Sequence, residues 1–273
     1  MIRTSPKPLP RPIFPHLKRE RLPKGRAVTI GIGFHCDEGI VLCADTQISW
    51  QGKHKIHESK VFYLSGINWT MASVYAGDPH LWKSFQDKFR ELIRAEVKTT
   101  KDLRDILETA LCYFTELDSD PTSLCLLMGF VIRDKEIKLV KTVGKLISDV
   151  SGFDYVGCGD SSVLRYLAPI MADKDRWMSI NQALQVGTYW VLQAKRYAED
   201  CGGDTDAFVL HWNGSMQTRS NMTYNWEQHC LRLEGDAGKI FQSFWDTSVD
   251  AAQFDQILDR FCVHLREERR TVL

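Results

Sequence analysis

The sequence predicts an α+β fold in which two antiparallel sheets stack on each other and a layer of helices covers the outer face of each sheet. Three observations support this prediction. Short apolar, β-branched runs occur in pairs joined by turn sequences, as in β-hairpins. Pairs of helical patterns separate these blocks of strands, whereas a parallel fold alternates one strand with one helix. The runs are apolar on both faces, which indicates sheets that are covered on both sides.

Four apolar runs open the body of the chain and pair into two hairpins. The first hairpin turns at Asp37-Glu38-Gly39 and the second at Ser65-Gly66, and both are typical turn sequences. The four strands are expected at residues 28–36, 39–45, 60–64 and 69–75.

Two helices follow, over residues 78–95 and 100–117. Asp78 followed by Pro79 is the pattern of a helix cap with proline at the first helical position, and Thr100 caps the second helix. Because their apolar stripes exceed what one sheet face needs, we expect part of them to face another copy of the chain. The stripes consist of Leu81, Phe85, Phe89 and Leu92, and then Leu103, Ile106, Leu107, Ala110, Leu111 and Phe114.

The second half of the body repeats the order of strands followed by helices. Ser179 and Gln182 form a capping box that opens a long helix, which ends at Gly202-Gly203. Strands are expected at 123–132, 136–142, 152–157 and 205–212, and a further helix near 161–171. Residues 213–248 are interpreted as turn-rich, and 250–268 as a final amphipathic helix.

The first 27 residues differ in composition from the rest of the chain. They contain eight basic residues, one acidic residue and six of the nine prolines, so their net charge is +7 and residues 28–273 sum to −7. Such a segment is not expected to pack as a folded element. We therefore expect a basic, proline-rich arm or propeptide over residues 1–27, a globular domain over 28–220 and a C-terminal extension over 221–273 that packs on it.

Charge and hydropathy exclude several classes of partner. An acidic body does not present the broad basic face of a duplex-binding protein. No apolar run approaches the ~20 residues of a membrane span, and the N-terminus lacks the apolar core of a signal peptide. We therefore expect neither a nucleic-acid nor a membrane partner, and a cytoplasmic location.

The sequence contains little that indicates a metal site, a redox-active cysteine or a nucleotide-binding site. The eight cysteines are dispersed without a C-x-x-C pair, as in proteins of a reducing compartment, and no cysteine has a context that would lower its pKa. His54 and His57 are a close pair without a third ligand nearby. Gly157-x-Gly159 is a partial dinucleotide fingerprint that we interpret as a tight strand-to-helix turn, because Ser162 replaces the third glycine. No metal or cofactor is expected.

Four segments are similar to those of a known family. They begin with TIGIGFHCDEGIVLCADTQIS at Thr29 and continue with MASVYAGD at 71–78, YVGCGDSSVLRYL at 155–167 and SINQALQVGTYWVLQAKRYAEDCGGDTDAFVL at 179–210. Over residues 28–212 the chain resembles proteasome β-type subunits, which belong to the N-terminal-nucleophile (Ntn) hydrolases. The resemblance implies a four-layer αββα sandwich of two antiparallel sheets over residues 28–220.

The resemblance implies catalytic roles for three residues. In the family, a threonine freed as the N-terminus is the nucleophile, and the catalytic aspartate lies sixteen positions later, which is the separation of Thr29 and Asp45. The family's lysine corresponds to Lys60, one residue short of the usual spacing. A threonine hydroxyl is a weak nucleophile and needs an adjacent base, and a free α-amine with a pKa of about 7.7–8.0 suits that task.

Further positions depart from the family in residue type. Ser73 takes the oxyanion-hole position, where the family usually has glycine and only the main-chain N–H is used. Cys201 stands where the family has a serine before paired glycines, and Ala198 replaces an aspartate three residues earlier. Val28 precedes Thr29 where the family has glycine, and an alternative register places Val28 itself at the nucleophile's position.

Two functions follow from the resemblance, and both remain open. The first is a threonine-type amidohydrolase or peptidase that acts on a peptide or protein, assembles into a homo-oligomeric ring and has an unfoldase ATPase as a candidate partner. The second is a catalytically inactive subunit of the same fold, with an assembly or binding role and a retained N-terminal arm. The mature N-terminal residue distinguishes them, since only the enzyme requires the loss of residues 1–28.

Overall fold

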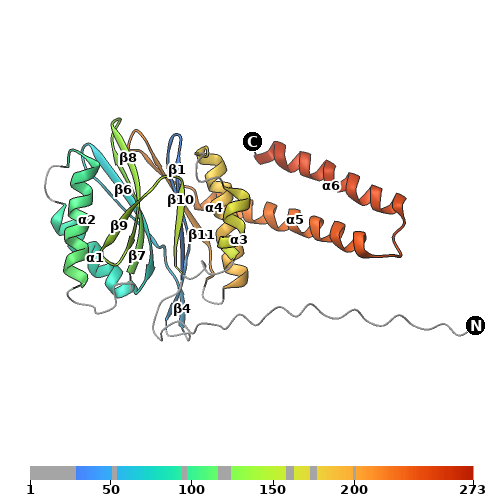
Figure 1. Cartoon of the computed structure of the whole chain (residues 1–273), viewed down its shortest axis with the longest axis horizontal. Helices are drawn as coiled ribbons and strands as arrows, with labels where there is room; N and C mark the ends of the chain where they lie inside the picture. Colours follow the sequence, from blue (N-terminus) through green and yellow to red (C-terminus); the bar gives the residue numbers. More distant parts are fainter. Residues whose placement is uncertain are drawn as a thin grey trace, which may run out of the picture.

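Two five-stranded antiparallel sheets form the centre of the molecule (Figure 1). The structure is a computed structural model, and it describes residues 29–50, 54–93, 97–115, 124–157, 163–172, 177–198 and 201–272. One sheet has the order β10-β1-β2-β11-β12, with bounds Phe153–Gly157, Ile30–Cys36, Gly39–Asp45, Thr205–His211 and Met216–Thr218. The other has the order β5-β6-β7-β8-β9, with bounds Val61–Ser65, Trp69–Gly77, Leu124–Ile132, Glu136–Val143 and Leu146–Val150.

A small sheet follows β2 after the single residue Thr46. It consists of β3 (Gln47–Trp50) and β4 (His54–His57), which pair antiparallel, and β4 lies at one end of the two large sheets (Figure 1). The sequence patterns do not predict this hairpin, because its strands are only four residues long and the alternation of Gln47-Ile48-Ser49-Trp50 is too short to identify a strand.

Six helices belong to the described residues: α1 (Pro79–Leu92), α2 (Thr100–Thr115), α3 (Val163–Met171), α4 (Ile180–Tyr197), α5 (Ser220–Trp245) and α6 (Ala251–Val272). The caps predicted for α1 and α4 are confirmed, whereas the cap predicted at Thr100 is wrong: Thr100 is the first residue of α2, and the Thr99 hydroxyl accepts from the Asp102 N–H over 3.2 Å. The Asp78 side chain accepts a hydrogen bond of 2.7 Å from the backbone N–H of His80, with proline as the first residue of α1. Ser179 and Gln182 form the capping box of α4.

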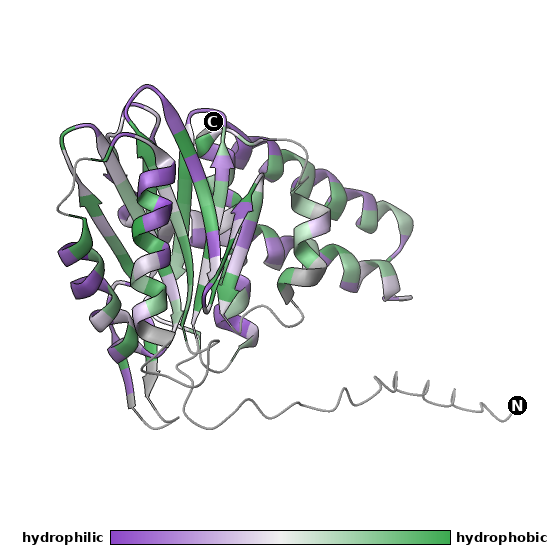
Figure 2. Ribbon diagram, turned by 60° about the vertical axis from the view of Figure 1, so that its left-hand side comes forward, coloured by the Kyte–Doolittle hydropathy of each residue, from purple (hydrophilic) through white to green (hydrophobic). Residues whose placement is uncertain are grey.

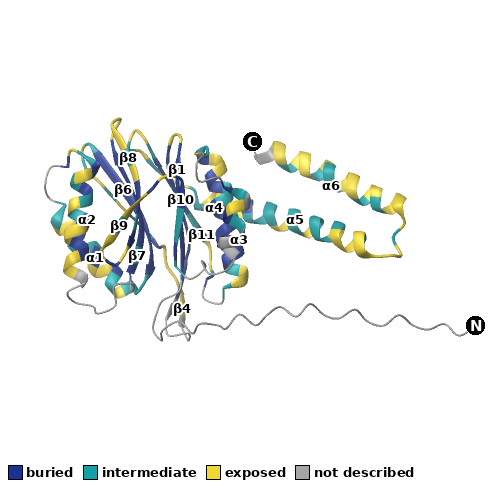
Figure 3. Cartoon of the chain, in the orientation of Figure 1, coloured by how far each residue is buried: buried dark blue, intermediate teal, exposed yellow. Residues whose placement is uncertain are grey.

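Three apolar cores hold the layers together. One lies between α1, α2 and the β5–β9 sheet and contains Phe85, a second lies between the two sheets and contains Val74, and a third lies between the β10–β12 sheet and α3 and α4 and contains Trp190. Figure 2 shows the apolar bands along the strands, and Figure 3 shows the central strands of both sheets buried between the helices. Each fully buried large apolar side chain contributes about 1.5–3 kcal/mol to stability. The predicted mixed fold of antiparallel sheets and covering helices is confirmed.

The apolar stripes of α1 and α2 pack mostly against the β5–β9 sheet of the same chain. Phe85, Phe89, Leu103 and Leu107 are fully buried against the β5–β9 sheet. Tyr113 is the exposed large apolar side chain among the described residues of these two helices. Most of the described stripe residues therefore pack within the chain, which contradicts a large apolar surplus for another copy; the side chain of Phe114 lies outside the described residues.

The interpretation of residues 213–248 as turn-rich is also wrong. Gly214 does make a turn, with φ of 77°, but it closes the β11–β12 hairpin, and the 26-residue helix α5 follows. Gly235 and Gly238 are each about 1 kcal/mol less favourable than alanine inside a helix, so the sequence around them does not predict one. The helix persists because its first half packs on α4 and β11 and its second half on α6.

α5 and α6 form an antiparallel hairpin that extends away from the sheets (Figures 1 and 3). The amphipathic helix predicted at 250–268 is confirmed as α6, which packs against α5. The N-terminal arm predicted at residues 1–27 lies outside the described residues. Within the described ranges, no helix combines the length and the apolar character that crossing a bilayer requires.

Candidate active site

The first hairpin and the start of β5 bring three predicted site residues together. β1 and β2 pair with Gly31 opposite Ala44, so Thr29, just before β1, lies beside Asp45 at the end of β2. The backbone N–H of Ile30 donates to Asp45 Oδ1 over 3.0 Å, which fixes this end of the hairpin. Lys60 directly precedes β5 in the opposite sheet.

The three side chains share one hydrogen-bond network. Thr29 Oγ1 donates to Asp45 Oδ1 over 2.6 Å, and Lys60 Nζ donates to the same oxygen over 2.7 Å. Lys60 Nζ also donates to Thr29 Oγ1 and to the main-chain oxygen of Gln47. The threonine hydroxyl is therefore in contact with one cation and one carboxylate; the carboxylate orients the hydroxyl, and the cation would stabilise negative charge on its oxygen.

The network is closed to solvent. The exposed fractions of Thr29, Asp45 and Lys60 are 2%, 0% and 1%. A buried lysine and a buried carboxylate are tolerated when each compensates the other and their remaining hydrogen bonds are satisfied, as here. From the sequence alone, a lysine at the start of a strand is predicted to be exposed to solvent. The burial of Lys60 could be seen only in the structure.

The segment that contains Cys201 supports Asp45 through a neighbouring residue. The Gly202 N–H donates to Asp45 Oδ2 over 3.1 Å, and the Gly202 carbonyl accepts from the Gln47 N–H over 3.1 Å. Cys201 itself is buried in the core beside α4, and its N–H donates to the carbonyl of Ala198 over 3.1 Å. A Cβ at Gly202 would lie 2.5 Å from Gln47 Oε1, so a larger residue there would require the Gln47 side chain to move.

Sequence reasoning missed two groups of the site, the Gly202 N–H and the Gln47 carbonyl. The signal for the first was present in the paired glycines after α4, of which Gly203 has φ of 72°. Main-chain groups carry no residue identity, so no pattern could point to the Gln47 carbonyl.

Ser73 lies in the middle of β6, between Phe62 of β5 and Met128 of β7. It is fully buried, and its hydroxyl has no hydrogen-bond partner among the described residues. The side chain therefore does not join the network of Thr29, and the use of its main-chain N–H as an oxyanion donor stays a prediction.

Gly157 belongs to the site for a steric reason. It is the last residue of β10, pairs with Ile30 and has φ of 104°, and a Cβ there would lie 1.8 Å from the main-chain oxygen of Thr29. Because it has no Cβ, this glycine allows the end of β10 to approach the main-chain carbonyl of Thr29 closely. The tight turn predicted after Gly157, with Gly159 and Ser162, lies outside the described residues.

A second polar cluster, formed by side chains of α4, β11 and α5, binds the segment of Gly202 and Gly203. Lys195 Nζ of α4 donates to the Gly203 carbonyl over 3.1 Å, to Thr205 Oγ1 over 3.0 Å and to Glu227 Oε1 of α5 over 2.5 Å. Thr205 Oγ1 also donates to Glu227. The side chains of Lys195 and Glu227 are 11% and 13% exposed, so this ion pair is little screened by water.

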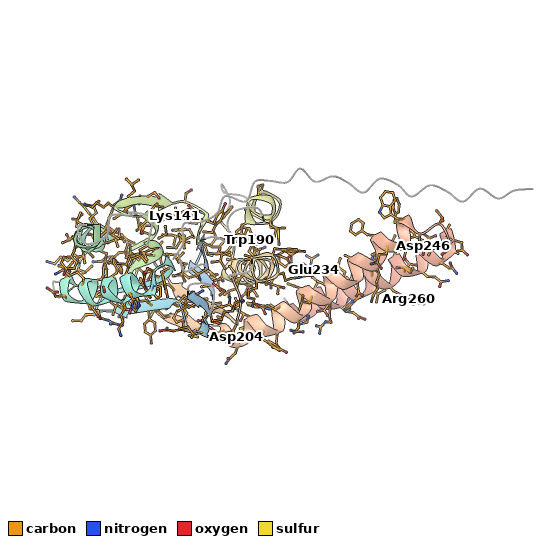
Figure 4. All side chains as sticks on the ribbon, turned by 90° about the horizontal axis from the view of Figure 1, so that it is seen from below. Lys141, Trp190, Asp204, Glu234, Asp246 and Arg260 are labelled. Atoms are coloured by element: carbon orange, nitrogen blue, oxygen red, sulfur yellow. The ribbon has the colours of Figure 1, made fainter. Side chains whose placement is uncertain are left out.

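We predict that Lys195→Met loosens the Gly202 segment. Losing the ammonium removes the hydrogen bond to the Gly203 carbonyl, so the Gly202 amide should exchange with solvent deuterium about tenfold faster, the size of one lost charge-assisted hydrogen bond. Amide exchange followed by NMR tests this. The matched control is Arg196→Met, which removes the adjacent cation bound to Glu234 (labelled in Figure 4) on the same two helices. Equal exchange at Gly202 in both variants would contradict the prediction.

The buried Cys36 and Cys43 behave as small apolar residues. Burial, with the Asp37 carboxylate as the next cause, raises the pKa of Cys36 to about 12, and burial raises the pKa of Cys43 further. Within the described ranges, no group of three or more His, Cys, Asp or Glu side chains could hold a metal ion. The site offers acid–base and nucleophilic chemistry from its own side chains.

We therefore predict that thiol alkylation separates the cysteines by exposure. Iodoacetamide near neutral pH should modify the exposed Cys112 at least tenfold faster than Cys36 and Cys43, because the reagent needs both access and a thiolate. Peptide mass spectrometry measures the three rates. Unfolding in guanidinium should equalise them, and equal rates in the folded protein would refute the prediction.

Comparison with known proteins gives no relative by sequence. The sequence matches no protein-family model, and it matches no curated protein.

Comparison with solved structures gives similar folds. The Anbu structure from Yersinia bercovieri, described as an ancestral beta-subunit, is similar with a TM-score of 0.66 and 14% identity, covering 78% of this chain and 97% of that one. Anbu from Hyphomicrobium sp. strain MC1 gives a TM-score of 0.65 and 12% identity over 77% and 97% of the two chains. A helical assembly of the Anbu complex from Pseudomonas aeruginosa gives 0.57 and 14% over 76% and 96%. The chain therefore has the proteasome-like fold of the Anbu subunits.

Proposed function

We propose that the protein is a threonine-type amidohydrolase, acting on peptides or proteins, whose nucleophile is Thr29 freed as the N-terminus. The observation that carries this proposal is the Thr29 hydroxyl held by Asp45 and Lys60 in a buried network. A structural role alone would be served by an apolar trio at lower cost, because a buried ion pair seldom stabilises a fold more than apolar side chains of similar volume.

The proposed reaction has two steps. The freed α-amine of Thr29 accepts the hydroxyl proton while Oγ1 attacks the carbonyl carbon of the substrate, and the Ser73 N–H receives the oxyanion. The amine passes the proton to the leaving nitrogen as the C–N bond breaks, which leaves an ester on Thr29. A water molecule, deprotonated by the same amine, then hydrolyses the ester and restores the hydroxyl.

Asp45 and Lys60 have supporting roles in this reaction. The Lys60 ammonium stabilises negative charge on Oγ1 and favours the neutral, basic form of the freed amine nearby. Asp45 holds the lysine and the hydroxyl, and the segment of Cys201 and Gly202 holds Asp45. The three cores between successive layers support the four-layer αββα arrangement of an Ntn hydrolase as the frame of this site.

Three further properties belong to the same proposal. The chain self-assembles into a homo-oligomer, which the likeness to a protein that forms a helical assembly supports. An unfoldase ATPase is the candidate partner for delivering folded substrates. The cytoplasm is the expected compartment, because dispersed free cysteines suit a reducing environment.

The intact mass of the purified protein tests the proposal. We expect a chain that begins at Thr29, and a single adduct on Thr29 after treatment with a threonine-directed covalent inhibitor such as a peptide epoxyketone. A full-length chain that assembles and forms no adduct would refute it.

That outcome would favour the second candidate, a catalytically inactive subunit with an assembly or binding role. The observation in its favour is the α5–α6 hairpin, which extends from the body and has exposed aromatic side chains.

A further inference from the structure

Helix α6 uses one of its faces to pack against α5. Residues spaced by three and four positions form this face, and Ile257, Phe261 and His264 among them line a cavity between α6 and α5. His264 Nδ1 lies 2.7 Å from Asp236 Oδ2 of α5, and Glu268 binds His229 of the same helix. This face therefore has its partner within the chain.

A second face of α6, about a third of a turn away, has apolar side chains that α5 does not cover. Leu258 and Leu265 are 38% and 44% exposed, and Cys262 lies between them on the same stripe and is half-buried. The spacing of four and three residues makes this a continuous apolar seam of the kind that packs helix against helix.

The two ends of this seam carry charges of opposite sign. Residues 246–259 contain four aspartates and no basic residue, whereas residues 260–270 contain four arginines and two glutamates. On the seam itself, Asp255 and Asp259 stand on one side of Cys262, and Arg266 and Arg269 stand on the other, all four exposed.

This arrangement is self-complementary. Cys262 lies midway between Asp255 and Arg269, and nearly midway between Asp259 and Arg266. An antiparallel copy of the helix, centred on the same cysteine, would place each aspartate beside an arginine of the other copy and leucine beside leucine. Isologous contact of this kind is the commonest route to a closed dimer.

We propose that the second copy of this chain is the partner of α6, with two α6 helices paired antiparallel about Cys262. This inference rests on the proposed self-assembly and names its surface, and it does not depend on catalysis. The hairpin projects from the body, with Asp246 at its far end, so the seam is accessible to another molecule (Figure 4).

The end of the hairpin supports the same pairing. Phe241, Phe244 and Trp245 are 67%, 60% and 76% exposed, on the part of α5 that extends beyond α4. In an antiparallel pair the far end of one α6 lies beside the C-terminal end of the other. Each aromatic end is thereby carried toward the body of the partner copy, where these side chains can be buried.

Charge reversal tests the proposal. Light scattering of the wild-type protein at micromolar concentration should give at least two chains per particle. The variant with Asp255→Arg and Asp259→Arg, and the reciprocal variant with Arg266→Glu and Arg269→Glu, should each dissociate at least tenfold more readily, because like charges then face each other across the seam. An equimolar mixture of the two variants should associate again as a heterodimer.

A disulfide cross-link tests the register. In a Cys112→Ser background, mild oxidation should link two chains through Cys262, and Cys262→Ser should abolish the link. A matched control exchanges Lys83 for Glu, an exposed charge on α1 far from the hairpin, and should leave the association unchanged.

The outcomes are distinguishable. A monomeric wild-type chain would refute both self-assembly and this surface. An oligomer that survives both charge-reversed variants, or that forms no link through Cys262, would refute the surface and leave self-assembly standing. Circular dichroism of each variant excludes unfolding as the cause of dissociation.

Discussion

Thr29→Ala should abolish cleavage of the chain before residue 29 and hydrolysis of any amide substrate together. The substitution removes the hydroxyl that attacks in both reactions, and a chain that is not cleaved has no free amine at this position. Loss of a nucleophile typically lowers kcat by about 10⁴-fold or more. Intact mass and turnover of a fluorogenic peptide measure the two effects on the same preparation.

Two variants control this experiment. Thr29→Ser keeps the hydroxyl and loses one methyl group, so it should retain part of both reactions. Ser73→Gly should be nearly neutral for activity, because only the main-chain N–H is assigned a role and the buried hydroxyl has no partner among the described residues. Hydrolysis by purified Thr29→Ala at the wild-type rate would rule out the assignment of the nucleophile.

Lys60→Met should cost both activity and stability. From the sequence alone, a lysine at the start of a strand can be removed without unfolding the protein. In the structure the ammonium is 1% exposed and compensates Asp45, which is 0% exposed. Removing one partner of a buried ion pair leaves an uncompensated charge and costs about 3–5 kcal/mol. Urea unfolding followed by fluorescence measures this loss.

The double variant Lys60→Met with Asp45→Asn separates charge from packing. It removes both charges, so it should be more stable than Lys60→Met alone by about 1–3 kcal/mol while remaining inactive. If the double variant were no more stable than the single one, lost packing of the lysine chain rather than the unpaired carboxylate would explain the effect.

The sequence predicts the strands that define the site because their signals are local. An apolar run on each side of Asp37-Glu38-Gly39 is enough to predict β1 and β2 and to place Thr29 beside Asp45. The resemblance then brings Lys60 to the same place, although Lys60 and Asp45 lie in opposite sheets. That the three side chains share a buried hydrogen-bond network is a property of the fold and could not be read from their spacing.

The features that the sequence did not predict depend on contacts between residues far apart in the chain or lack a local pattern. α5 has two internal glycines and polar residues throughout, so its helix depends on α4, β11 and α6 rather than on local preference. β9 is a sheet-edge strand with mostly exposed residues, and its pattern lacks the apolar alternation of a covered strand. The Gly202 N–H reaches Asp45 across 157 positions of sequence, and no local pattern encodes a main-chain group.

The first half of helix α5 supports the Gly202 segment beside the site, and its second half belongs to the hairpin. Near its start, Thr223 donates to the Thr205 carbonyl over 2.7 Å, and Glu227 binds Lys195, which holds the Gly203 carbonyl. The remaining turns run out to the far end, about 39 Å from the first residue at 1.5 Å per residue. Because one helix joins the two regions, we expect association at its far end to restrict motion at its base. Specific activity should therefore rise with protein concentration over the range in which the hairpins associate.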